Sequence, residues 1–370
     1  MAVPAVSYSN LVYPSASSGF IPEATGQVIA FTIDPGEFKI NSYVQNVKTP
    51  KPIGVYAVLD RDAPVRVVND ADFVWKDGDE RPEGREQIGR FQERSFIATR
   101  RDYSFMLGET ALETTDLYDL KATEQGNAAS RAMVNRTNRV ISMLETTGNW
   151  PSTNVATATA LNGGRGNWAT ASNDISSGNY LAVQRTIYAA LANILLQTNS
   201  KVKPKDMVLV LSPNAAVATA NSSEIHDYIS HSPAAIEQLT GKAAALNPNL
   251  AWGLPTNLYG IELVIEDCPR VTTRPDMSAT GDQGSFVGGA GSRVFVKSDS
   301  TAFLISRKGG LKGIYGAKSF STVQCYFWKY ELAVEIFNDA RNKRMDGHVV
   351  EYFAEVLAAP IAGMLITGIT

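Results

Sequence analysis

The sequence predicts an elongated α+β protein. Few charges and frequent prolines mark the first 52 residues, a long amphipathic helix is predicted at 116–147, and short helices and strands follow it. The 370 residues suffice for one large or two modest domains with a hydrophobic core. Apolar residues make up 44% and charged residues 19%, which is the composition of a folded chain rather than a disordered one.

The segment 1–52 has the pattern of an extended arm. Its first charged side chain is Glu23, and prolines from Pro4 to Pro52 interrupt every short apolar run. The strand-like piece 28–33 lies between them, but proline excludes a long central strand. A free chain of this kind would aggregate, so we expect it to lie across another surface. A floppy tail is the alternative.

Residues 53–107 predict a long hairpin with a polar tip. Strands are expected at 55–59 and 65–68, with a returning strand at 96–105. Glycine, proline and aspartate in 75–86 mark turns, and the mixed charge keeps this tip in water. Because so long a hairpin is marginal alone, it needs a partner surface, and we interpret the tip as a contact between subunits. The candidate contact residues of the tip are Trp75, Lys76, Asp77, Asp79, Glu80, Arg81, Glu83 and Arg85.

The strongest helix of the chain is predicted at 116–147. One of residues 114–116 caps its start, and Gly148 stops it. Apolar residues recur at helical spacing, while charged residues that include Arg136 and Arg139 occupy much of the remainder. At about 1.5 Å per residue the helix would be about 45 Å long, which indicates an elongated domain with a helical spine.

A compact α/β unit is predicted after this helix. The buried strand 207–211 runs into Ser212-Pro213, where serine is the N-cap and proline the first helical residue of another helix. The other expected elements are helices at 179–198, 225–229 and 234–239, a strand at 261–265, and a glycine-rich loop at 278–292.

The last part of the chain predicts strands joined by a charged turn. The expected strands are 293–297, 301–306, 323–337 and 348–357. Arg341, Lys343 and Arg344 form a basic cluster in the turn between the last two, flanked by Asp339 and Asp346. Since no aromatic residues interleave with the cluster, a solvated turn or a subunit contact is favoured over a nucleic-acid site.

No catalytic or metal-binding constellation emerges from the sequence. His226 and His231 are five residues apart, which is the wrong spacing for a pair one helical turn apart. Phosphate-loop and nucleophile-elbow motifs are absent, so we expect no enzymatic activity and no cofactor. Cys268 and Cys325 match neither a disulfide framework nor a metal motif, and we expect two reduced, mostly buried thiols.

The net charge and the two terminal segments limit where the protein can be located and which partners it can have. A net charge of −3 gives no electrostatic case for a dedicated nucleic-acid binder. The N-terminus lacks the pattern of a signal peptide, and the apolar stretch 356–369 is too short to span a bilayer. We therefore expect a cytoplasmic protein without a membrane segment.

The order of these parts resembles the Hong Kong 97-type (Johnson) fold of tailed-phage major capsid proteins over nearly the whole chain. Residues 208–214 are the piece most similar to the family. Under this resemblance the segments are the N-terminal arm (1–52), the E-loop hairpin (53–107), the P-domain with its spine helix (108–175), the A-domain (176–322), and the P-domain return strands with the C-terminus (323–370).

The resemblance implies a major capsid (head) subunit that assembles as hexamers and pentamers into an icosahedral shell in the host bacterial cytoplasm and becomes part of the virion. Phage double-stranded DNA would be enclosed without sequence-specific binding. No charged scaffolding region precedes the arm, so we expect that the chain either starts mature or uses a separate scaffolding protein. The other implied partners are a portal and possible decoration proteins. The alternatives are an encapsulin-like compartment shell, a soluble binding protein and an unrecognised enzyme, and the size of the purified particle separates them.

Overall fold

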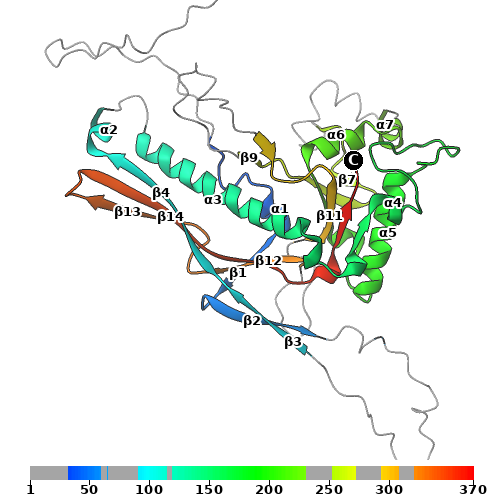
Figure 1. The fold of residues 1–370 in the computed structure, drawn as a ribbon, viewed down its shortest axis with the longest axis horizontal. Helices are drawn as coiled ribbons and strands as arrows, with labels where there is room; N and C mark the ends of the chain where they lie inside the picture. The colour runs from blue at the N-terminus through cyan, green and yellow to red at the C-terminus, as the bar shows by residue number, and fades with distance from the viewer. Residues whose placement is uncertain are drawn as a thin grey trace, which may run out of the picture.

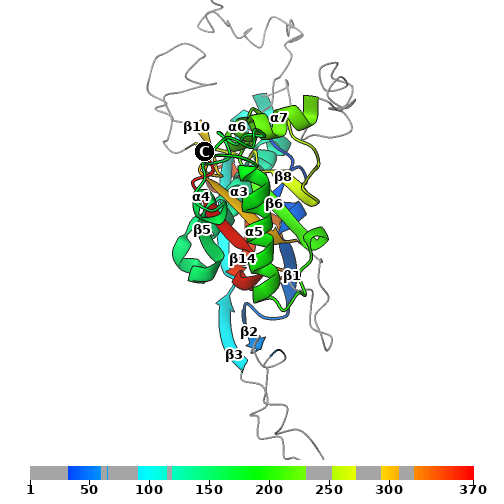
Figure 2. The ribbon, with the colours of Figure 1, turned by 90° about the vertical axis from the view of Figure 1, so that its right-hand side faces the viewer.

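The computed structural model describes residues 32–59, 65, 91–114, 119–230, 252–271, 293–307 and 321–370. Within these ranges the chain forms two units, each built on one larger sheet, with a long helix lying between them and along the first (Figure 1). A two-stranded hairpin extends from the first unit, and the same arrangement is visible after a quarter turn (Figure 2).

The first sheet is organised around its longest strand, β14. In the described ranges, β4 pairs antiparallel along one side of β14, β13 and β12 pair antiparallel along the other, and β1 joins β12 in parallel. These strands are β1 (Gln45–Thr49), β4 (Thr99–Gly108), β12 (Val323–Trp328), β13 (Ala333–Asp339) and β14 (Arg344–Leu357).

Helix α3 (Leu120–Glu145) covers one face of this sheet. It begins where the side chain of Asp119 accepts a hydrogen bond from the N–H of Ala122 at 2.9 Å, a standard N-cap. Its 26 residues correspond to about 39 Å. Its buried face starts with small residues, Ala128 and Ala132, and continues with Val140 and Leu144, which lets the helix approach the sheet closely. The predicted spine helix is confirmed, but its N-cap is Asp119 rather than one of residues 114–116, and it ends at Glu145 rather than at Gly148. A short helix, α2 (Glu109–Thr114), that the sequence did not indicate precedes it.

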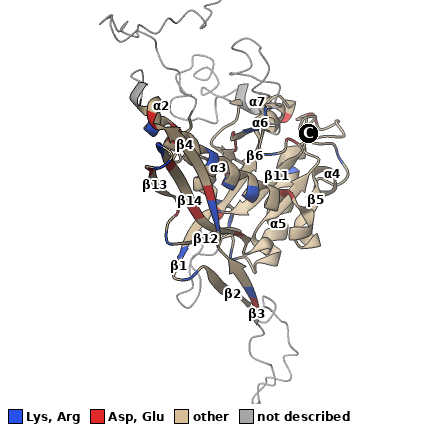
Figure 3. Cartoon of the chain, turned by 60° about the vertical axis from the view of Figure 1, so that its left-hand side comes forward, with Lys and Arg blue, Asp and Glu red and all other residues tan. Residues whose placement is uncertain are grey.

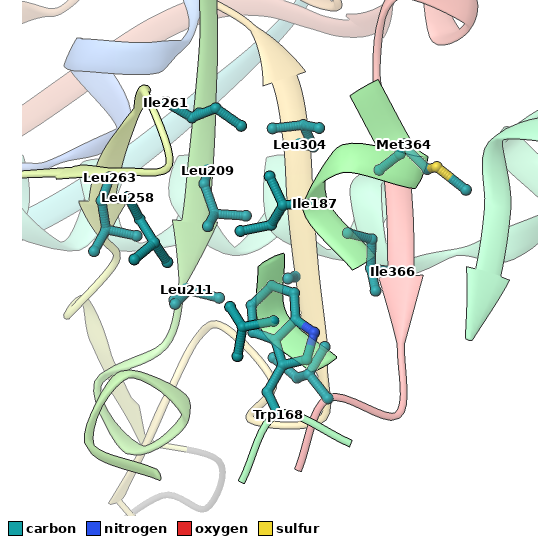
Figure 4. Packing of buried hydrophobic residues seen from close by; sticks show 14 of the residues in the cluster. Trp168, Ile187, Leu209, Leu211, Leu258, Ile261, Leu263, Leu304, Met364 and Ile366 are labelled. Atoms are coloured by element: carbon teal, nitrogen blue, oxygen red, sulfur yellow. The ribbon is translucent and has the colours of Figure 1, made fainter. Parts of the chain in front are cut away.

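The second unit is a sheet covered by helices. Among the described strands the order is β5-β15-β11-β6-β8-β7. Ile187 of the helix α5 packs beside Leu209, Leu304 and Ile366, which come from separate strands (Figure 4). The strands are β5 (Val155–Thr157), β6 (Met207–Leu211), β7 (Asn257–Leu258), β8 (Ile261–Ile265), β11 (Thr301–Ser306) and β15 (Met364–Thr367), and the helices are α4 (Ala158–Leu161), α5 (Ala182–Gln197), α6 (Pro213–Ala220) and α7 (Ser223–Ser230).

The start of α5 is completed by a residue from another helix. Leu181, its N-cap, has a φ of 50° and offers no capping side chain. The buried carboxylate of Glu224, from α7, accepts hydrogen bonds from the N–H groups of Val183 and Gln184, each at 2.9 Å. A negative charge at a helix N-terminus is favourable, so this contact holds two helices of the second unit together.

The predicted arm needs a correction. Residues 38–49 were expected to lie across another surface, but they form part of the core of their own subunit. Phe38, Tyr43 and Val47 are buried, and β1 forms a ladder with β12. The short helix α1 (Ile40–Tyr43) turns the chain into that strand. Residues 1–31 lie outside the described part of the chain.

Two of the predicted strands are broken. The returning strand 96–105 divides at Ala98 into β3 (Phe91–Ile97) and β4, which belong to different sheets. The strand predicted at 323–337 is interrupted around Lys329, which has a φ of 60°. The strands predicted at 207–211, 261–265 and 301–306 are confirmed at both ends.

Sheet membership also differs from the predicted division of the chain. β5 and β15 were assigned to the first domain, with 108–175 and 323–370, but both strands pair within the second sheet. Other short elements are η4 (Thr147–Asn149), η5 (Ser152–Asn154), η6 (Pro204–Asp206), η10 (Pro360–Ala362), β9 (Pro269–Val271) and β10 (Arg293–Phe295). The segments predicted at 66–68, 234–239 and 278–292 lie outside the described residues.

Candidate assembly surface

The hairpin formed by β2 (Ile53–Leu59) and β3 is set on the first unit by stacked aromatic rings. The ring of Phe96 lies 4.0 Å from that of Tyr326, with 8° between their planes, and Tyr56 stacks on the same tyrosine at 6.2 Å. A Cβ on Gly54, which pairs with Phe96 across the hairpin, would lie 2.3 Å from the phenylalanine ring, so a larger residue there would displace the ring from its stack on Tyr326. Burial raises the pKa of the Tyr326 hydroxyl to about 12.

The other face of the hairpin carries three exposed apolar side chains, next to the polar residues Ser95 and Glu93 of β3. Ile53, Val55 and Ile97 are 61%, 58% and 63% exposed, and Ile53 and Ile97 are direct cross-strand partners. In the described ranges β2 and β3 pair only with each other. A two-stranded sheet is marginally stable by itself, and exposed apolar clusters mark interaction sites. We refer to Ile53, Val55 and Ile97 as the outer hairpin face.

The interface of α3 with the sheet contains buried charges in place of a purely apolar contact. Arg136, predicted on the polar side of the helix, is buried and pairs with Glu351 of β14 at 2.8 Å. Arg139 pairs with Glu351 at 2.5 Å and with Glu355 at 2.8 Å. Arg101 of β4 also pairs with Glu355, at 3.4 Å. Figure 3 marks charged positions in colour along the ribbons of α3, β4 and β14.

These ion pairs fix how the helix sits on the sheet. The guanidinium of Arg136 also lies 3.7 Å from the centre of the Phe353 ring and donates to the carbonyl of Glu331 at 2.8 Å. Burial opposes the charge on Arg139, but the carboxylates of Glu355 and Glu351 outweigh it and raise the pKa of Arg139. Because each bond joins α3 to a defined position on β14 or beside it, a shift of the helix by one turn would leave charges buried without partners.

The basic cluster predicted as a contact lies in the turn between β13 and β14. Arg341 and Lys343 are exposed there, and the carboxylate of Asp339 accepts hydrogen bonds from the backbone N–H groups of Arg341 and Asn342. Arg344 pairs with Asp339 at 3.5 Å and with Asp346 at 3.2 Å. The turn is thus stabilised internally, and its role as a subunit contact remains a prediction.

Exposed apolar side chains lie close to this turn. Met106 of β4 and Phe337 of β13 are both more than half exposed. A shallow cavity of about 360 Å³ is lined by residues of β4 and β14. Its lining residues are Ser104, Phe105, Met106, Arg344, Asp346 and His348.

Sequence reasoning and structure identify different parts of the hairpin. The predicted tip residues Trp75, Lys76, Asp77, Asp79, Glu80, Arg81, Glu83 and Arg85 lie outside the described residues. The outer hairpin face was not predicted. Its signal was the sequence Ile53-Gly54-Val55-Tyr56, where both faces of a strand are apolar apart from the glycine. Such a strand, with an apolar residue on each side, requires burial on both sides.

Within the described ranges, no set of side chains has a recognisable catalytic arrangement. The Nδ1 atom of His348 lies 3.0 Å from the carboxylate of Asp102 on the exposed face of the first sheet. Among the described residues, no three His, Cys, Asp or Glu side chains cluster to hold a metal ion, and no helix is long and apolar enough to cross a membrane. Cys268 and Cys325 are both free and buried.

Comparison with known proteins yields matches in structure only. No family model and no curated protein matches the sequence. The mature capsid of bacteriophage PhiM1 is similar to the chain with a TM-score of 0.54 and 12% identity, covering 92% of this chain and 90% of that one. A phage-related protein from Bordetella bronchiseptica RB50 is similar with a TM-score of 0.52 and 14% identity, and the match covers 88% of this chain and 89% of that one. The capsid of Staphylococcus phage Andhra is similar with a TM-score of 0.51 and 9% identity, and the match covers 94% of this chain and 88% of that one.

These similarities cover nearly the whole chain and define its class of fold. The α+β architecture is the Hong Kong 97-type fold of phage capsid proteins, as the sequence predicted. The division of the chain into arm, E-loop, P-domain and A-domain stays a prediction.

Proposed function

We propose that the chain is the major capsid subunit of a tailed bacterial virus and assembles with copies of itself into a closed icosahedral shell. The observation that carries the proposal is the outer hairpin face, where Ile53, Val55 and Ile97 are exposed on a hairpin with no further strand beside it in the described ranges. The fold shared with phage capsids supports the same assignment.

Burial of this face against a neighbouring copy explains how the hairpin is stabilised. Apolar area removed from water contributes about 25 cal/mol per Å², so covering one isoleucine contributes about 1.5–3 kcal/mol. The hairpin reaches out from one side of the subunit, and its partner surface is a different part of the next copy. Contacts of this head-to-tail kind generate rings when the rotation closes, and hexamers and pentamers are such rings.

Several finer features belong to the same proposal. The subunit uses a separate scaffolding protein during assembly in the bacterial cytoplasm, and a portal and decoration proteins complete the virion. The shell confines double-stranded DNA without reading its sequence, in keeping with a net charge of −3. The subunit acts as a structural protein and catalyses no reaction.

Particle size tests the proposal. The full-length chain is expressed alone and together with its scaffolding protein, and the products are examined by sedimentation velocity and electron microscopy. We expect closed shells, sheets or capsomers of megadalton mass. Monodisperse monomers or dimers under all conditions would contradict the proposal and favour a soluble binding protein or an enzyme. Shells that carry protein cargo and no DNA when isolated from infected cells would favour a compartment shell.

A further inference from the structure

A buried carboxyl lies where the N-terminal segment meets the second unit. Glu266 follows β8 and is fully buried, as is Tyr43 at the end of α1. The hydroxyl of Tyr43 donates a hydrogen bond to Oε2 of Glu266 at 2.6 Å. The backbone N–H of Cys268 donates to the other carboxylate oxygen at 3.3 Å.

This contact joins two separate parts of the fold. Tyr43 leads into β1 and is thereby part of the first sheet. The N–H of Glu266 donates to the carbonyl of Leu211 at 2.8 Å, at the end of strand β6 in the second sheet. The pair therefore fastens residues 38–49 to the second unit through one side-chain hydrogen bond, surrounded by apolar residues of one shared core cluster.

The carboxyl of Glu266 faces few groups that could compensate a negative charge. On its own segment it faces Asp267 and Cys268, and from the N-terminal segment it faces Tyr43 and Lys39. Cys325 of β12 also interacts with Tyr43. No ion pair joins Glu266 to a cation within the described part of the chain. Burial raises the pKa of Glu266 from 4.5 to about 7, although the hydrogen bonds from Tyr43 and Cys268 oppose the rise.

We propose that Glu266 and Tyr43 form a pH-dependent latch, which holds residues 38–49 against the second unit while the carboxyl is neutral and loosens them once it is charged. A charged carboxylate at this position has lost its water shell, and Lys39 and the two hydrogen bonds offset that loss only in part. The nearest way to restore hydration is to open the contact between α1 and the segment after β8. The proposal rests on the fold of a single subunit and does not depend on assembly.

The direction of the pH dependence follows from the position of the proton. Because the folded state holds the proton up to about pH 7 and the unfolded chain releases it near 4.5, the folded state binds more protons between these values. Stability contributed by this group is therefore complete below about pH 4.5, falls as the pH rises above that value, and is lost once the pH has passed through about 7. This dependence of stability on pH is opposite in sign to that of an ordinary salt-bridged carboxylate, which stabilises the fold at higher pH.

Hydrogen exchange and thermal unfolding test the latch in the full-length subunit. Protection factors of the amides at 40–49, corrected for the intrinsic exchange rate at each pH, are measured at pH 5.5 and pH 8.5. We expect about a tenfold loss of protection at the higher pH in the wild type, together with a lower melting temperature. In Glu266→Gln, which keeps an acceptor for Tyr43 without the charge, both quantities should be independent of pH over this range.

Glu262→Gln is the matched control, because Glu262 lies on β8 but its side chain is 37% exposed and pairs with Arg307. This variant should keep the wild-type pH dependence. An infrared measurement on the wild type covers the case in which Glu266→Gln does not fold. A protonated-carboxyl C=O band should be present at pH 6 and absent at pH 8.5. Equal pH dependence in wild type and Glu266→Gln, or no such band at pH 6, would overturn the latch.

Discussion

Two regions of the molecule differ in which side chains they bury: one buries charged residues, and the other exposes apolar ones. Between α3 and β14, the charged residues Arg136 and Glu351 are only 4% and 0% exposed. On the hairpin, the apolar residues Ile53 and Ile97 are mostly in water. The buried charges have all their partners inside the subunit, so that interface is complete. Among the described residues the exposed apolar side chains have no such partners, and under the proposed function a neighbouring copy covers them. Burial alone therefore separates what stabilises the subunit from what is available for assembly.

The largest expected effect comes from placing a charge on the outer hairpin face. Ile97→Asp should leave the subunit folded, with an unchanged melting temperature, because the side chain is exposed in the single subunit. Shell formation should fall by at least about tenfold at equal concentration, since each lost apolar contact weakens a subunit interface by about 1.5–3 kcal/mol. Light scattering during assembly measures the effect.

The control adds the same charge to the opposite face of the same strand. Gln92→Asp changes an exposed residue of β3 that alternates away from Ile97. It should assemble like the wild type. Equal losses in both variants would mean that strand β3 tolerates no added charge and that the outer face has no special role.

The second prediction concerns the complete interface. Glu351→Ala removes the carboxylate that both Arg136 and Arg139 contact and should lower the free energy of unfolding by about 3–5 kcal/mol. The exposed pair of Glu335 with Arg100 gives the comparison, and Glu335→Gln should cost no more than about 1 kcal/mol. Urea denaturation of the unassembled subunits measures both. Similar losses would show that burial does not distinguish the two ion pairs.

A third prediction extends the comparison to the hairpin tip, which lies outside the described residues. Replacing 75–86 by a short Gly-Ser turn should preserve the circular dichroism spectrum of the subunit. Shells should form poorly or dissociate at lower salt, because weak polar contacts that are repeated around a ring add up through multivalency. An unfolded variant would place the tip in its own subunit's core, and shells of normal salt stability would make it a solvated loop.

The smallest effect is expected from the two thiols, which are buried in the core of the subunit. Burial raises the pKa of Cys268 to about 12 and raises that of Cys325 as well, so neither forms a reactive thiolate at neutral pH. Native protein should react negligibly with a thiol reagent at pH 8. Denatured, unreduced protein should release two thiols per chain. A disulfide-linked ladder on a non-reducing gel would contradict the predicted reduced state.

Local signals were sufficient for some elements. Met207–Leu211 is continuous apolar sequence followed by Ser212 and Pro213, and the strand ends and the helix begins at those residues. The side chain of Ser212 accepts from the N–H of Ala215 at 3.2 Å, so the cap is formed by residues three apart. The body of the spine helix was equally predictable, because its apolar spacing is also a local feature, although the helix ends at Glu145, three residues before Gly148.

Other features depend on partners far away in the sequence. The arm-like composition of 38–49 does not reveal that β12, almost 280 residues later, offers a parallel edge to β1. Arg136 looks like a surface residue until Glu351 is placed opposite it. The outer hairpin face was missed because Ile53, Val55 and Ile97 read as ordinary strand residues, and only the fold shows that no other strand in the described ranges covers them.

The sequence by itself determined the order of the parts and the class of fold, since helix length, caps and strand periodicity are set by neighbours along the chain. The tertiary structure decided which strands share a sheet. β15, close to the C-terminus, pairs with β11 and β5, and β4 leaves the hairpin for β14. It also decided which charges are buried in pairs and which apolar side chains stay exposed. Those outcomes depend on contacts between segments hundreds of residues apart, whose free energies of burial and pairing no local pattern records.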